Sequence, residues 1–148
     1  MRVNLGSLGG GGSIAGPVTV GTGRGAAILA PAHGLGEPLT LTILNQVTFN
    51  ADGNCSFTFR KEREEQFSDQ VIAEGVTINE AMFSATGQSD GPLILGTVLT
   101  AISNTSADPI SGTFNNLPDA AIITVNGNNL QASYTGGDGN DLTLTVVP

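Results

Sequence analysis

A glycine- and aspartate-rich run near the end of the chain has the composition of a calcium-binding loop. Residues 136–144 read GGDGNDLTL, which fits the nine-residue repeat of calcium-binding β-rolls. Calcium takes about six to eight oxygen ligands, and the carboxylates of Asp138 and Asp141 offer two of them. Calcium in a β-roll lies between successive coils, so a single copy provides half a site at best. The sequence therefore favours a structural turn with local hydrogen bonds, and keeps Asp138 and Asp141 as the calcium candidates. No other cofactor is indicated.

Sugar-binding sites usually contain exposed aromatic side chains, because sugar rings stack on aromatic faces. The chain has no Trp, one Tyr and six Phe. Tyr134 and Phe57 are the candidate ligand-binding residues, although Phe57 and Phe59 share one face of a strand that can equally be core. Asp- and Asn-rich loops also offer hydrogen bonds to sugar hydroxyls. A carbohydrate-binding module that recognises polysaccharide through a solenoid face or loops is therefore an alternative function.

Two short motifs resemble enzyme signatures but lack the context that the chemistry needs. Residues 87–91 read GQSDG, which matches G-x-S-x-G, yet that motif requires a helix after the serine and a histidine downstream. The only histidine, His33, lies upstream, so we expect a loop. Residues 21–26 read GTGRGA and approximate a dinucleotide fingerprint, but Pro31 follows too soon for the required helix.

Scattered carboxylates leave a second alternative, a polysaccharide-active β-helix enzyme. Glu37, Asp69 and Glu74 could meet across a groove, but no spacing along one strand selects them. We predict no catalytic residues, and expect His33 to be a solvated loop residue. Cys55 is the only cysteine, so it cannot form an intrachain disulfide, and burial as a small apolar group is its expected role.

Composition limits the remaining function classes. The net charge is -8, and three of the five basic residues lie in residues 60–65 beside three Glu, which argues against nucleic-acid binding. No stretch reaches the roughly 20 apolar residues of a membrane span. The start of the chain lacks the apolar core of a signal peptide. We therefore expect either a protein that is not exported or a trimmed piece of an exported one, and the glycine-rich strand pattern favours the trimmed piece.

The strands that would position these residues are predicted from a short sequence unit that recurs along the chain. The unit apolar–Thr–apolar–turn begins at Val18, Val47 and Val76, 29 residues apart both times (47 − 18 and 76 − 47), and again at Ile123 off the period. Alternation directs the apolar side chains to one face and Thr to the other, as in a half-buried strand. Repeats of this length are typical of stacked coils. We predict that Val18, Val47 and Val76 stack in parallel and in register.

Other strands and a cap are predicted from alternation and turn residues. The expected strands cover residues 39–44, 55–60, 70–73, 93–100, 130–134 and 142–147. Residues 61–66 carry strong helix formers without an apolar stripe and predict a single solvated helical turn. Residues 122–125 and 130–134 predict a hairpin through Asn126-Gly127 that closes onto residues 142–147. Such an antiparallel cap would cover the last coil of a solenoid.

The C-terminal part of the chain resembles a known family. Residues 111–121 read SGTFNNLPDAA and residues 134–144 read YTGGDGNDLTL, and over roughly the last 45 residues the chain is similar to the C-terminal end of proteins with autotransporter-associated β-strand repeats. The resemblance implies a right-handed parallel β-helix outside the bacterial cell. It implies no catalytic residues. Against that family's pattern we expect this short chain to carry neither an export signal nor a membrane-spanning barrel.

Together these observations predict an all-β, right-handed parallel β-helix (β-solenoid) with a C-terminal antiparallel cap. We expect residues 1–148 to form a single domain, a fragment or C-terminal part of a larger passenger. The expected function is that of a non-catalytic, extracellular structural or adhesive module at a bacterial surface. Surface glycans or neighbouring passenger repeats are the expected partners. Nucleic acid and a membrane span in this chain are not expected.

Overall fold

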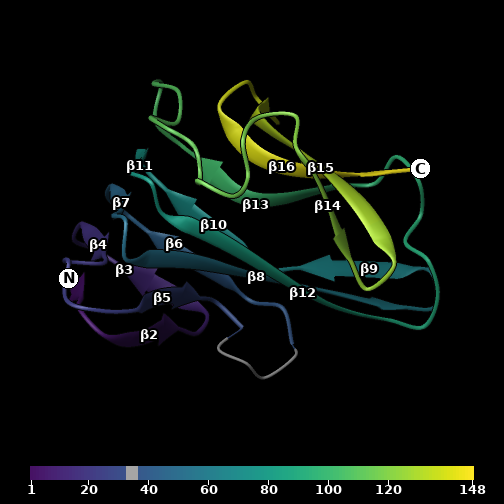
Figure 1. Ribbon diagram of the computed structural model, residues 1–148, viewed down its shortest axis with the longest axis horizontal. Helices are drawn as coiled ribbons and strands as arrows, with labels where there is room; N and C mark the ends of the chain where they lie inside the picture. Colours follow the sequence, from purple (N-terminus) through teal and green to yellow (C-terminus); the bar gives the residue numbers. More distant parts are fainter. Residues whose placement is uncertain (33–36) are drawn as a thin grey trace.

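The protein is a β-solenoid whose chain passes repeatedly through three sheets in the same order (Figure 1). A computed structural model describes residues 1–32 and 37–148. Sheet A contains β1 (Arg2–Val3), β4 (Val18–Val20), β7 (Val47–Phe49) and β11 (Val76–Ile78). Sheet B contains β2 (Gly6–Gly9), β5 (Ala27–Ala30), β8 (Gly53–Glu62) and β12 (Met82–Ser89). The parallel part of sheet C contains β3 (Gly12–Ile14), β6 (Thr40–Ile43), β10 (Gln70–Ala73) and β13 (Val98–Asn104).

The 29-residue spacing of the sequence repeat matches the register between neighbouring strands of sheet A. Val18 pairs with Val47, and Val47 pairs with Val76, in parallel strands. All three valines are buried, while the central Thr of each strand is half-exposed on the outer face. The predicted parallel stacking of the three units is therefore confirmed.

The turn residue that ends each unit also stacks from coil to coil. The Asn50 side-chain amide donates to the Gly21 carbonyl at 2.7 Å, and the Asn79 amide donates to the Asn50 side-chain oxygen at 3.2 Å. A side-chain amide donates and accepts, so the same residue can bond to the coils on both sides. These bonds set the spacing of the coils where each short strand of sheet A ends.

The C-terminal strands form the predicted antiparallel cap. β14 (Ile122–Val125) pairs with β15 (Asn128–Gly136), β15 pairs with β16 (Asp141–Val147), and β16 pairs with β13, all antiparallel. Asn126 and Gly127 have φ of 50° and 76°, the left-handed pair that a two-residue hairpin turn requires. Figure 1 shows these strands lying over the last coil. The cap therefore covers the end of the solenoid that β13 would otherwise leave open.

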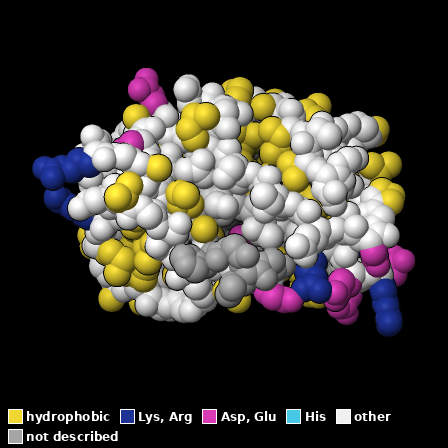
Figure 2. All heavy atoms as spheres, turned by 60° about the horizontal axis from the view of Figure 1, so that its bottom comes forward, with side chains coloured by type: hydrophobic (Ala, Val, Ile, Leu, Met, Phe, Trp, Pro, Cys, Tyr) yellow, Lys and Arg dark blue, Asp and Glu magenta, His cyan; other side chains and the backbone are white. Residues whose placement is uncertain are grey.

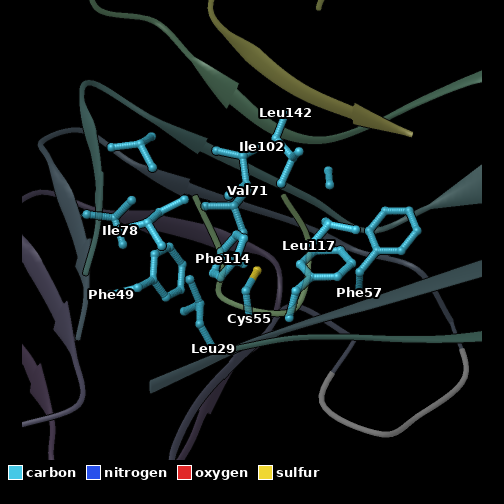
Figure 3. Close-up of a cluster of buried hydrophobic side chains, with 14 of the residues drawn as sticks. Leu29, Phe49, Cys55, Phe57, Val71, Ile78, Ile102, Phe114, Leu117 and Leu142 are labelled. Atoms are coloured by element: carbon cyan, nitrogen blue, oxygen red, sulfur yellow. The ribbon is translucent and has the colours of Figure 1, made fainter. Parts of the chain in front are cut away.

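The core lies between the three sheets and under the cap. Figure 3 shows side chains from sheet B (Leu29, Cys55), sheet C (Val71) and the segment before the cap (Phe114, Leu117) directed into one space. The Phe114 ring lies 5.3 Å from that of Phe49 and 5.4 Å from that of Phe83, between centroids. Aromatic contacts at these separations add stabilisation beyond the area that they bury. The core thus joins the coils to the segment that closes them.

Two sequence-based expectations about elements are wrong. Residues 61–66 do not form a helical turn: β8 continues to Glu62, the chain turns at Arg63, and β9 (Glu65–Ser68) pairs back onto β8. A helical turn this short cannot offset its nucleation cost, whereas the hairpin satisfies the same backbone groups across two strands. The strand expected over residues 93–100 begins only at Val98, because Gly96 turns the chain with φ of 85°. The described residues form no helix, and hence none that could span a membrane.

Candidate functional site

The glycine-rich run at residues 136–141 forms the turn that joins β15 to β16. Gly137 and Gly139 have φ of 58° and 113°, which side chains with a Cβ adopt poorly. The Gly139 N–H donates to the Gly136 carbonyl at 2.9 Å, and Gly136 pairs with Asp141 across the two strands. The turn that the sequence favours is therefore present.

Asp141 does more than form local hydrogen bonds, which corrects the sequence-based expectation. Its carboxylate is buried and accepts the Asn104 N–H at 2.9 Å, from a residue 37 positions earlier. Burial raises the pKa of Asp141, and the negative charge of the neighbouring Asp138 raises it further. Asp141 thus ties the tail turn to the end of β13, while Asp138 stays exposed.

Two asparagine side chains add hydrogen bonds from the tail turn and from the end of β13 to other segments of the chain. The Asn140 amide donates to the Ser106 carbonyl at 2.7 Å and to the Asp108 carbonyl at 3.2 Å. The buried Asn104 side-chain oxygen accepts the Gly75 N–H at 3.2 Å. In the described part of the chain no three His, Cys, Asp or Glu side chains gather as they would around a metal ion. Asp138 and Asp141 stay calcium candidates that the structure does not test, and a structural turn without calcium stays the prediction.

Tyr134 lies inside the protein, so it does not present a ring to a sugar. The side chain is buried, its hydroxyl donates to the Leu117 carbonyl at 2.7 Å, and it accepts the Phe114 N–H at 3.0 Å. Burial raises the pKa of Tyr134 to about 12. The hydroxyl holds the segment that covers the core, and this role explains why the only Tyr occurs in the cap.

Phe57 is also buried, because β8 turns that face of the strand toward the core. Its ring stacks with that of Phe83 at 6.0 Å between centroids. Cys55, two residues earlier on the same face, is buried as expected, and burial raises the pKa of its thiol to about 12. Both candidate aromatic ligands therefore belong to the core, and the expectation of an exposed stacking ring at either position is wrong.

The two enzyme-like motifs have structural roles in the coils. Gly87 and Ser89 lie at the end of β12 rather than in the expected loop, and a Cβ on Gly87 would lie 2.0 Å from the Phe59 ring. Residues 21–26 form a loop before β5, with no helix. Three backbone N–H groups of this loop, from residues 22–24, donate to the Asp52 carboxylate at 2.7–3.1 Å. Asp52 thereby joins two neighbouring coils.

The scattered carboxylates do not form an acidic pair in a groove. Asp69 is buried and accepts the Leu39 and Thr58 N–H groups at 2.9 and 3.0 Å. Burial raises the pKa of Asp69, while these two hydrogen bonds act to lower it. Glu37 is exposed and paired with Arg60, and Glu74 is exposed at the end of β10. His33 lies outside the described residues.

The β8–β9 hairpin carries a cleft that sequence reasoning missed. Arg60 pairs in register with Phe67 across the hairpin, and the Arg60 guanidinium forms ion pairs with Glu37 and Glu62. Together with Pro38 these side chains line a cleft of about 250 Å³. In Figure 2 basic and acidic side chains lie side by side at the lower right, and further basic side chains lie at the opposite end of this face. We call the cleft lined by Glu37, Pro38, Arg60, Glu62 and Phe67 the hairpin cleft.

The other side of the hairpin is more acidic and faces the end of β12. A second cleft of about 670 Å³ is lined by Glu62, Arg63, Glu64, Glu65 and Asp90. The Arg63 N–H donates to the Asp90 carboxylate at 2.8 Å. The hairpin is therefore held in place by the neighbouring coil. One sequence feature could have revealed it: Arg60, Glu62 and Phe67 fall on one face when residues 60–67 are read with a period of two around a turn.

Comparison of the chain with known protein families, curated proteins and solved structures finds no match.

Proposed function

We propose that this chain is a non-catalytic structural and adhesive β-solenoid module of a bacterial extracellular surface protein, and that its open end pairs with a further β-coil. The solenoid fold, the use of its polar side chains and the contrast between its two ends support this proposal. The bacterial, extracellular setting rests on the resemblance of the last 45 or so residues to autotransporter-associated repeat proteins.

Buried polar side chains support a structural role, because they bond to the backbone of neighbouring coils. Asp141 bonds to β13, and Asp69 bonds to β8 and to the segment before β6. The exposed Asn116 adds bonds to both backbone groups of Phe83, at 2.8 and 2.7 Å. A buried acceptor that is fully hydrogen-bonded fixes the geometry around it. These groups are therefore engaged in holding coil to coil.

The single observation that carries the proposal is the contrast between the two ends of the solenoid. At the C-terminal end β16 pairs with the edge of β13 along its length. In the part of the chain that the structure describes, the edges of β11 and β12 have no strand partner there, but later segments bond to them locally, Ser111 to Val76 and Ile78 and Asn116 to Phe83. At the other end, the outer edges of β1, β2 and β3 have no strand partner within the described residues. Within the described residues, only the C-terminal end of the solenoid is thus covered by later segments and a cap.

The open end also lacks the features that usually protect an exposed sheet edge. Natural edge strands are commonly protected by charged side chains, Pro or bulges. Arg2 is the only charged side chain in residues 1–23, and β2 and β3 contain only Gly, Ser, Leu and Ile. Leu5 is 75% exposed near this edge. An uncharged, glycine-rich edge allows the close approach of another backbone and favours pairing with a further coil.

A fusion that supplies one more coil tests the proposal. A copy of residues 18–46 placed directly before Met1 puts its Val20 29 residues ahead of Val3, the spacing of the sheet A repeat. In-register pairing should raise the melting temperature by about 4 °C or more, because each added coil contributes an interface term.

A matched fusion serves as the control. One extra Ser at the junction shifts the register and turns the apolar side chains of the added strand outward. This fusion should melt at the temperature of the unfused chain. Equal melting temperatures for the two fusions would contradict the proposal.

A further inference from the structure

One aromatic side chain, that of Phe67, is exposed to solvent, whereas the other aromatic side chains are buried. The one Tyr and six Phe all lie in the described part of the chain, and Phe67 alone is exposed, at 45%. The other rings are each 7% exposed or less. Water contact with an apolar ring is unfavourable, so a ligand that covers the Phe67 ring gains free energy from that contact.

The side chains around Phe67 are polar and charged. Arg60 lies directly opposite Phe67 in the β8–β9 register, so the two side chains share one face of the hairpin. The side chain of Arg60 is 27% exposed and pairs with Glu37 and Glu62, which are 70% and 59% exposed. A guanidinium has five donors, so two ion pairs leave donors available beside the free lone pairs of the carboxylates. The hairpin cleft thus presents an apolar ring beside hydrogen-bond donors and acceptors.

This combination matches the chemistry of a sugar. A pyranose has an apolar C–H face that can cover the Phe67 ring, and hydroxyls that both donate and accept. Two carboxylates and one guanidinium give the hairpin cleft a net negative charge, and Glu65 lies opposite Glu62 in the hairpin. Negative charge disfavours acidic sugars and is compatible with neutral ones. The volume of about 250 Å³ lies below the usual range for drug-sized ligands, which suits one or two sugar rings.

We propose that the hairpin cleft binds a neutral saccharide unit of a surface glycan, with Phe67 stacking on the sugar ring and Arg60, Glu37 and Glu62 bonding its hydroxyls. This inference rests on the adhesive part of the proposed function and supplies its ligand class. It replaces the buried Tyr134 and Phe57 with a ring that solvent reaches. One small exposed cleft binds weakly, with Kd on the order of 1 mM, so adhesion requires several modules acting together.

The test uses the full chain and neutral hexasaccharides of glucose, mannose and galactose as probes. Binding is detected by saturation-transfer NMR and measured by calorimetry, with oligogalacturonate as the acidic comparator. Phe67→Ala should weaken binding about tenfold or more, and Arg60→Gln about fivefold. Phe67→Trp should keep or strengthen binding. Leu44→Ala is the matched control, because Leu44 is also an exposed apolar residue, at 58%, but does not line the hairpin cleft. Leu44 follows β6, whereas the cleft residue Glu37 precedes β6. This substitution should not change binding.

Three results would overturn this inference. One is the absence of binding by any neutral probe up to about 10 mM, an order of magnitude above the expected Kd. Another is undiminished binding by both Phe67→Ala and Arg60→Gln. The third is tighter binding of oligogalacturonate than of the neutral probes. Any of these could occur while the in-register fusion still melts higher, so failure of the saccharide site is distinguishable from failure of the structural proposal.

Discussion

Tyr134→Phe is the substitution that most cleanly probes how the cap is held over the core. It removes one oxygen and leaves the ring, so the loss comes from the two hydrogen bonds to the Phe114 N–H and the Leu117 carbonyl, at 3.0 and 2.7 Å. Each buried group left without a partner costs about 1–3 kcal/mol. Allowing for partial relaxation, we expect a loss of about 2–4 kcal/mol in the free energy of unfolding. For a chain of this size that corresponds to a fall of about 4–16 °C in melting temperature.

Urea unfolding followed by far-ultraviolet circular dichroism measures this loss, since the substitution removes the only Tyr and the chain has no Trp for fluorescence. Ser133→Ala, on the outer face of the same strand, is the control and should change stability by less than about 0.5 kcal/mol. A Tyr134→Phe loss no greater than that of the control would refute the reasoning, because it would mean that the hydroxyl does not hold the segment before the cap.

Four further substitutions, a calcium titration and a pH titration test other parts of the account. Gly139→Val should lower stability by about 1–3 kcal/mol in urea unfolding, because φ of 113° strains a branched residue. Calcium should not shift the melting temperature, and a calcium-dependent rise that disappears in Asp141→Ala would show that the tail turn is a calcium site. Gly87→Ala should destabilise by about 1–3 kcal/mol, since its Cβ would meet Phe59 at 2.0 Å; a neutral result in thermal melts would contradict that packing. Because burial raises the pKa of Asp69 above 3.8, its stabilising contribution is lost as pH rises through its folded pKa. Wild type should therefore gain stability relative to Asp69→Asn as pH falls toward 3.8, and a difference independent of pH would be inconsistent with this.

The stacked coils and the cap could be predicted from the sequence because local patterns specify them. The apolar–Thr–apolar units predict strands with one buried face, and their 29-residue spacing predicts the register of Val18, Val47 and Val76. Asn126-Gly127 predicts a two-residue hairpin because both residues accept positive φ. Each of these features rests either on residues that are neighbours in the chain or on a short pattern that recurs at a fixed spacing.

Features that depend on contacts between distant residues could not be predicted in this way. Alternation shows that Phe57 and Phe59 share a face, but only the stacking of sheet B shows that this face is buried. The bond between Asp141 and Asn104 spans 37 residues and leaves no local pattern. The β8–β9 hairpin was missed because helix-forming residue types outweighed the period-two alternation, and the hairpin cleft was missed with it. Strands as short as Arg2–Val3 carry too few residues to be recognised.

Amide hydrogen exchange at the open end tests the central claim most directly. The N–H groups of Gly6 and Gly10 bond inward to the next coil, so those of Ser7 and Gly9 face the open edge of β2. In the fusion carrying residues 18–46 in register, the Ser7 and Gly9 amides should become strongly protected, while the fusion with one extra Ser leaves them exchanging as in the unfused chain. Ser7 and Gly9 amides that exchange equally fast in all three proteins would contradict the claim that this edge pairs with a further coil.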